Sequence, residues 1–128
     1  MKQPKNILLV DDEEDFLETT SRRLRRRGFE VKTAARCRDA IPEVSAGWPD
    51  VVVLDVMLSD ADGMECLRRI KRQAPRLPVL MLTGHASLQA SIMGLEHGAS
   101  DYCLKPIELD ELVEKIIIAC KEANGNLP

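Results

Sequence analysis

The chain has 128 residues and a mass of 14.3 kDa, which is the size of one domain. Apolar residues make up 45% and charged residues 30%, a balance typical of a folded globular protein. The net charge of −3 argues against a dedicated nucleic-acid-binding protein, and no apolar run has the roughly 18 residues of a membrane span. The apolar stretch near the N-terminus is too short for a signal peptide, so we expect a cytoplasmic protein without membrane contact.

Apolar runs and segments with helical spacing alternate along the chain. In chain order, the pattern predicts a strand at 7–10, a helix at 14–27, a strand at 29–34, a helix at 38–46, a strand at 51–54, a helix at 64–73, a strand at 78–82, a helix at 85–95, a strand at 100–104 and a helix at 108–123. The strands at 7–10, 51–54 and 78–82 are continuously apolar, which is typical of strands buried on both faces.

Five strands alternating with five helices predict βαβ units and a parallel sheet covered by helices on both faces. The apolar strands favour the middle of the sheet, and the strands at 29–34 and 100–104 favour its edges. We therefore predict the strand order 2-1-3-4-5, a flavodoxin-like three-layer α/β fold. The domain is expected to span residues 1–123, with 124–128 as a tail or the start of a linker.

Polar side chains follow the predicted strands. Asp11 and Asp12 come after the first, Asp55 after the third, Thr83 after the fourth and Lys105 after the fifth. Sites in such sheets lie beyond the carboxyl ends of the strands, so we expect these side chains to meet. Three carboxylates in one crevice require a cation, and oxygen ligands without His or Cys suit Mg²⁺. Adding a lysine and a hydroxyl predicts a phosphoryl-transfer site with an aspartate nucleophile.

Four short segments at these strand ends resemble the receiver domain of bacterial two-component response regulators. They are 10–13 (VDDE), 54–57 (LDVM), 82–86 (LTGHA) and 101–106 (DYCLKP). Each segment alone is weak evidence for this family, but all four in this order are very specific for it. The resemblance covers essentially the whole chain. The LTGHA segment and 62–65 (DGME) look most like receivers of transcription-activator (NtrC-type) regulators.

The resemblance implies a role for each acid. Asp55 would accept a phosphoryl group from a sensor histidine kinase. Asp12 would bind Mg²⁺ together with Asp55 and the backbone carbonyl of Met57, and Asp11 would support the metal through water. Ser59 stands where the family commonly has proline. We therefore expect a more flexible loop after Asp55, which could loosen the geometry of the metal site.

The resemblance also implies a switch. Lys105 would pair with Asp55 or its phosphate, and the peptide bond between Lys105 and Pro106 would be cis. Thr83 would bond a phosphate oxygen, and Tyr102 would then swing inward and reshape the surface formed by residues 85–95, 100–104 and 108–123. That surface would control an output domain outside this chain, expected to bind DNA, and phosphorylation could produce a homodimer. The domain itself is not expected to bind nucleic acid or to be an enzyme.

Several alternatives stay open. The acids after the first strand could simply cap a helix, Thr83 could be a helix cap, and Tyr102 could be an ordinary edge-strand aromatic. The arginine run on the first helix is either a solvated face or a kinase-docking patch: Arg22, Arg23, Arg25, Arg26 and Arg27. His85 could border the site. The four cysteines have no CxxC spacing, and we expect them to be reduced thiols without metal or disulfide: Cys37, Cys66, Cys103 and Cys120.

Three other functions fit parts of this pattern. The chain could be a stand-alone response regulator that acts through protein contacts. A Mg²⁺-dependent phosphatase of the haloacid-dehalogenase type also uses an aspartate nucleophile, but its pattern places a second acid two residues on, where this chain has Met57. A flavodoxin-like cofactor protein would need a phosphate-binding loop after the first strand, where this chain has acids.

Overall fold

The computed structural model describes residues 4–56, 58, 62–84 and 95–123. Five parallel strands form one sheet in the order β2-β1-β3-β4-β5, which confirms the predicted topology. The strands are β1 (Asn6–Val10), β2 (Glu30–Ala34), β3 (Val51–Asp55), β4 (Val79–Thr83) and β5 (Asp101–Leu104).

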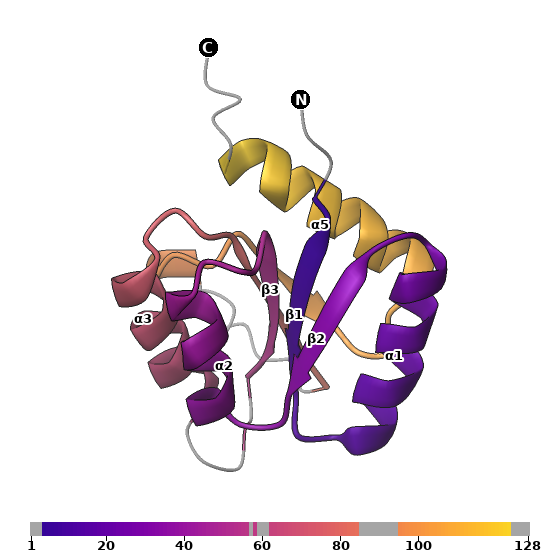
Figure 1. Cartoon of the computed structure of the whole chain (residues 1–128), viewed down its shortest axis with the longest axis horizontal. Helices are drawn as coiled ribbons and strands as arrows, with labels where there is room; N and C mark the ends of the chain where they lie inside the picture. The colour runs from indigo at the N-terminus through magenta and orange to yellow at the C-terminus, as the bar shows by residue number, and fades with distance from the viewer. Residues whose placement is uncertain (1–3, 57, 59–61, 85–94, 124–128) are drawn as a thin grey trace.

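Helices cover both faces of the sheet. They are α1 (Glu14–Arg26), α2 (Cys37–Ser45), α3 (Gly63–Gln73) and α5 (Leu109–Ala123). Figure 1 shows α1 and α5 on one face and α2 and α3 on the other. Most of the predicted helix at 85–95 lies outside the described residues. Within the described ranges, no helix has the length and apolar character needed to span a bilayer.

The core consists of two aliphatic layers, one on each side of the sheet. Ile7 and Leu9 point into the layer under α1 and α5, and Leu8 and Val10 point into the layer under α2 and α3. This alternation follows from the two-residue period of a strand. Full burial of one such side chain contributes about 1.5–3 kcal/mol before the entropy cost of ordering the chain.

Asp50 forms hydrogen bonds at the edge of the sheet where the strands begin. Its Oδ2 accepts the backbone N–H groups of Lys5 and Asn6, each at 2.9 Å. Its carbonyl oxygen lies 3.7 Å from Sγ of Cys120, near the end of α5. The start of β1 and the last turns of α5 are therefore held at the same edge of the sheet.

The prediction that all four cysteines are reduced thiols is wrong for two of them. Cys37 and Cys66 form a disulfide that joins α2 to α3, and the other two are free thiols. The two helices pack side by side on one face of the sheet, which brings the Cα atoms of the pair to 5.8 Å, within the range a disulfide requires. A sequence separation of 29 residues gives no sign of this proximity.

Candidate functional site

Three carboxylates meet where β1 and β3 end. Val10 lies beside Leu54 in the parallel register, so Asp11 and Asp55 follow neighbouring strand ends. Asp11, Asp12 and Asp55 each place a carboxylate oxygen within 4.8 Å of the others. Asp11 is 1% exposed and Asp55 6% exposed, whereas Asp12 is exposed to solvent. Because the cluster contains only oxygen donors and is partly open to solvent, it could bind a hard divalent cation.

The position of Asp11 is set by both of its neighbouring segments. Its backbone N–H donates to the carbonyl oxygen of Ala34 at 3.1 Å, which extends the pairing of β1 with β2 by one residue. Its Oδ1 accepts the backbone N–H of Glu13 at 2.9 Å, and this turn leads into α1. These two contacts leave Oδ2 of Asp11 to face the crevice.

Lys105 fills the crevice from the β5 side. Its Nζ lies 2.6 Å from Oδ2 of Asp11 and 2.5 Å from Oε1 of Glu13. It also lies 4.3 Å from the centre of the Phe16 ring. Burial favours the neutral amine, but the hydrogen bonds to Asp11 and Glu13 and the charges of Asp11 and Asp55 outweigh it and raise the pKa of Lys105. The side chain therefore remains an ammonium ion.

The structure gives Lys105 two hydrogen-bond partners that were not predicted. The resemblance paired this lysine with Asp55, but its ion pairs here are with Asp11 and Glu13, and Asp55 acts on it through its charge. The run of acids after β1 could have suggested that Glu13 lies near Lys105, but the run alone does not show which acid the lysine contacts. A direct contact with Asp55 or its phosphate stays a prediction. The peptide bond between Lys105 and Pro106 is cis, in agreement with the sequence-based expectation.

The chain after Asp55 packs against the start of α3. The backbone N–H of Gly63 donates to the carbonyl oxygen of Val56 at 2.5 Å. A Cβ atom on Gly63 would lie 2.5 Å from Cα of Val56, so only glycine fits here. Asp62 caps α3, with its Oδ1 accepting the N–H of Glu65 at 2.8 Å.

Two predicted contributors to the loop after Asp55 fall outside the part of the chain that the structure describes. They are Met57, whose carbonyl was expected to bind the metal, and Ser59. His85 also lies outside it. Their roles stay predictions.

The proposed switch residues belong to β4 and β5. Thr83 is the last residue of β4 and lies beside Leu104 in the register, so its backbone reaches the same edge of the sheet as Asp55. The side chain of Tyr102 is partly buried and packs against the core layer under α2 and α3. These positions are compatible with the predicted switch, which stays a prediction.

Some arginines of the run at 22–27 make contacts with other residues of the chain. Arg25 donates to the carbonyl oxygen of Val31 at 2.8 Å, and Arg27 forms an ion pair with Asp110 of α5. The other members are exposed: Arg22, Arg23 and Arg26. Arg22 also lies 3.9 Å from Oε1 of Glu18 on the same helix. The structure therefore gives three of the arginines intramolecular partners, and a docking role for the run stays a prediction.

Comparisons with known proteins agree with this geometry. Residues 7–117 match the family model described as "Response regulator receiver domain". The transcriptional regulatory protein TcrX of Mycobacterium tuberculosis, described as probable, is 40% identical over 114 residues, which are 89% of this chain and 49% of that protein. The DNA-binding transcriptional regulator NtrC of Proteus hauseri is 32% identical over 94% of this chain and 26% of that protein.

A solved structure supports the same assignment. The CheY-like response regulator receiver domain protein of Methanospirillum hungatei has a TM-score of 0.88 and 32% identity, covering 94% of this chain and 96% of that one. The chain spans about half the length of curated relatives such as TcrX, at 49%, and less of NtrC, at 26%. The family match and these relatives show that the chain belongs to the receiver-domain family of two-component response regulators.

Proposed function

We propose that Asp55 accepts a phosphoryl group from the phosphohistidine of a sensor histidine kinase. The observation that carries this proposal is the position of Asp55, a buried carboxylate at the end of β3 that shares a crevice with Asp11 and Asp12. An ammonium group, that of Lys105, lies in the same crevice and interacts with Asp55 through its charge. A nucleophilic carboxylate with cationic groups beside it is the arrangement that phosphoryl transfer requires.

The transfer exchanges one bond to phosphorus for another. The P–N bond of the phosphohistidine breaks, a P–O bond to a carboxylate oxygen of Asp55 forms, and the imidazole leaves. Asp12, Asp55 and the backbone carbonyl of Met57 would hold Mg²⁺, and Asp11 would support it through water. Mg²⁺, when bound, supplies positive charge for the equatorial oxygens of the phosphoryl group.

Lys105 would respond to the new charge. Its ammonium ion is held by Asp11 and Glu13 before phosphorylation, and a phosphoryl group on Asp55 adds a stronger anion to the same crevice. Lys105 would then pair with the phosphate, and the hydroxyl of Thr83 would donate to a phosphate oxygen. Tyr102 would turn inward behind Thr83 and change the surface formed by β5, α5 and residues 85–95.

This surface would control an output domain outside the present chain. Relatives named as transcriptional regulators are about twice as long as this chain, which supports a DNA-binding output domain. We propose residues 1–123 as the receiver, with 124–128 as a tail or the start of a linker, and a cytoplasmic location. The product would be a phosphorylated switch, able to form a homodimer, and not a metabolic enzyme.

The test is the intact mass after incubation with acetyl phosphate and Mg²⁺. We expect one adduct of about 80 Da, lost when EDTA replaces Mg²⁺ and absent in Asp55→Asn. The matched control is Asp39→Asn, which removes an exposed carboxylate from α2 and should leave the adduct unchanged. An adduct that survives in Asp55→Asn, or continuous hydrolysis of phosphate esters, would contradict the proposal.

A further inference from the structure

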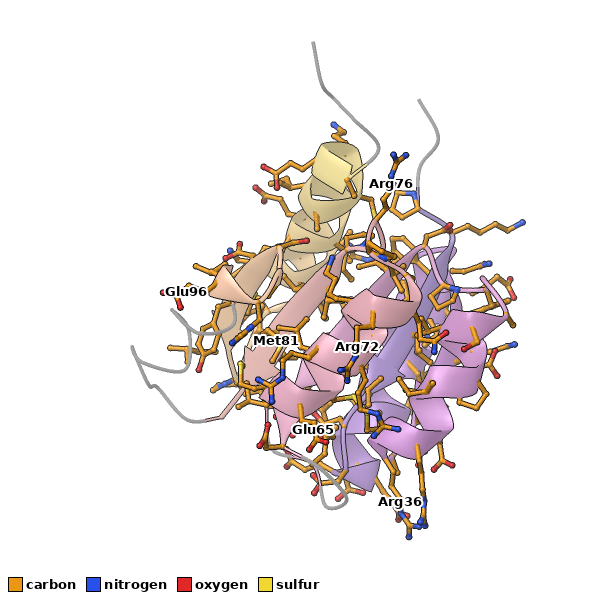
Figure 2. All side chains as sticks on the ribbon, turned by 90° about the vertical axis from the view of Figure 1, so that its left-hand side faces the viewer. Arg36, Glu65, Arg72, Arg76, Met81 and Glu96 are labelled. Atoms are coloured by element: carbon orange, nitrogen blue, oxygen red, sulfur yellow. A yellow bond between two sulfur atoms is a disulfide. The ribbon has the colours of Figure 1, made fainter. Side chains whose placement is uncertain are left out.

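The disulfide between Cys37 and Cys66 connects two helices at a defined place. Cys37 is the first residue of α2, and Cys66 lies in the first turn of α3, where its N–H donates to the carbonyl oxygen of Asp62 at 3.1 Å. Figure 2 looks onto this face and shows Arg36 and Glu65, the residues directly before the two cysteines, toward the same end of the helix pair. The crosslink therefore ties the beginning of α2 to the beginning of α3.

The surroundings of Cys37 favour the reactive form of a thiol. Nη1 of Arg69 donates to Sγ of Cys37 at 3.7 Å, and Arg69 reaches it from one turn beyond Cys66 on α3. Cys37 also occupies the amino end of a nine-residue helix, where the backbone N–H groups favour negative charge. A guanidinium and a helix amino end both stabilise a thiolate over a thiol, and the thiolate is the nucleophile in disulfide chemistry.

The remaining two cysteines provide a contrast within the same chain. Burial is the main cause that raises the pKa of Cys103 to about 11, and it likewise raises the pKa of Cys120 to about 11. The two sulfurs belong to the opposite core layer from Cys37 and Cys66. Cys37 and Cys66 are buried as well, so burial does not distinguish the two pairs. Their position does, because Cys37 and Cys66 have Cα atoms 5.8 Å apart, and oxidation is therefore expected to select this pair.

We propose that Cys37 and Cys66 form a redox modification site, a dithiol that small oxidants convert reversibly into the disulfide between α2 and α3. With hydrogen peroxide, the Cys37 thiolate attacks one oxygen, the O–O bond breaks, and Cys37 sulfenic acid and hydroxide form; a proton converts the hydroxide to water. The Cys66 thiol then attacks the sulfenic sulfur, the S–O bond breaks as the S–S bond forms, and the hydroxide leaves with the thiol proton as a second water. The two sulfurs lose two electrons in total, and an external dithiol returns them through thiol–disulfide exchange.

Burial determines which reagents can reach the pair. Both cysteines are 0% exposed, so exchange with solution requires the first turn of α2 to open locally. Small peroxides and small dithiols need less opening than a protein partner does. The site is therefore a switch for diffusible oxidants and reductants.

The first test counts thiols. After reduction with dithiothreitol and its removal, unfolding and alkylation should add four labels per chain; after peroxide treatment they should add two, with a mass loss of about 2 Da from the protein itself. Dithiothreitol should then restore four labels. Trypsin digestion without reductant should release the dipeptide Cys37-Arg38 attached to fragment 39–68. Four labels after peroxide, or a crosslink between other cysteines, would overturn the proposal.

Variants identify the residues that form the crosslink and those that set its rate of oxidation. Cys37→Ala and Cys66→Ala should each abolish the crosslinked peptide, whereas Cys120→Ala, a matched buried cysteine, should retain it. Arg69→Leu should slow peroxide oxidation about tenfold near neutral pH and move its pH profile to higher pH, and Arg69→Lys should restore part of the rate. Arg72→Leu, an exposed arginine on the same helix, is the control. An unchanged pH profile in Arg69→Leu would remove Arg69 from the proposal.

Thermal unfolding provides a measurement that needs no variant. Closing a loop with a sequence separation of 29 residues should raise the Tm of the oxidised wild-type chain above that of the reduced chain by about 10 °C. Equal melting temperatures for the two forms would contradict a crosslink that stabilises the folded chain.

Discussion

Lys105 and Asp11 form an ion pair of 2.6 Å across the crevice, although they follow β5 and β1, which β3 and β4 separate in the sheet. The lysine therefore connects opposite sides of the site, and the buried carboxylate of Asp11 keeps a cation beside it when no metal is bound. Any divalent cation that binds the three aspartates has to compete with this ammonium ion for Asp11.

Replacing Lys105 with alanine tests that competition. In Lys105→Ala the acids lose their internal cation, so their mutual repulsion increases and Mg²⁺ should bind about tenfold more tightly. Isothermal titration calorimetry gives the affinity directly. Lys121→Ala, which removes an exposed lysine from the last turn of α5, should leave the affinity unchanged. Weaker binding of Mg²⁺ to Lys105→Ala would show that the lysine supports the metal site and does not compete with it.

Asp12→Asn separates metal binding from folding. Asp12 is exposed, so its loss should not harm the core, and relief of repulsion should stabilise the metal-free protein by up to about 1 kcal/mol. Mg²⁺ at ten times its Kd should stabilise the wild type by about 1.4 kcal/mol and the variant much less. Urea unfolding with and without Mg²⁺ measures both effects. Equal stabilisation of wild type and variant would place the metal elsewhere.

Gly63→Ala should be the most damaging small substitution near the site. The added Cβ would meet Cα and O of Val56 at 2.5 Å, so the start of α3 would have to move away from the chain that follows Asp55. We expect a loss of about 2–3 kcal/mol in the free energy of unfolding. Gly84→Ala is the matched control because no atom of the described residues lies within 4 Å of its Cβ position. Unfolding of both alanine variants at the same urea concentration would contradict the predicted clash at Gly63.

Stability should fall as the pH rises above 9. Burial raises the pKa of Cys103 from 9.0 to about 11 and that of Cys120 by a similar amount, so between these values the unfolded chain ionises and the folded chain does not. The unfolded state then binds fewer protons, and the free energy of unfolding decreases across this pH range by at most about 3 kcal/mol per thiol.

The alkaline titration has a second, later phase. Lys105 has a raised pKa, so its contribution is complete below the ordinary value of 10.5 and is lost only as the pH passes its elevated value. Urea unfolding of the oxidised protein from pH 8 to 11 checks the order, because only Cys103 and Cys120 then carry thiols. Cys120→Ala should show about half of the loss between pH 9 and 11. An identical slope in this variant would assign the loss to other groups.

Much of the fold could be predicted because the strands differ in how far they are buried. Continuous apolar runs mark β1, β3 and β4 as central, and the alternating pattern of β2 marks an edge. The observed elements begin and end within one or two residues of the predicted ranges. The clustering of Asp11, Asp12 and Asp55 then follows from topology alone, since parallel strands end at the same edge of the sheet.

Two features could not be predicted from spacing. Which acids Lys105 reaches depends on the length of its side chain and on the turn that orients Asp11, and neither is visible in a motif. The contact of Cys37 with Cys66 depends on the relative rotation and offset of α2 and α3, which sequence periodicity does not fix.

Asp50 holds the start of β1 and the end of α5 at one edge of the sheet, and the aspartate crevice lies at the other. A five-residue strand separates these edges by about 16 Å. A domain fused after Ala123 would therefore be attached at the edge of the sheet opposite the phosphate on Asp55. Unless that domain folds back toward the crevice, a signal from Asp55 would reach it through shifts of side chains along the sheet and α5.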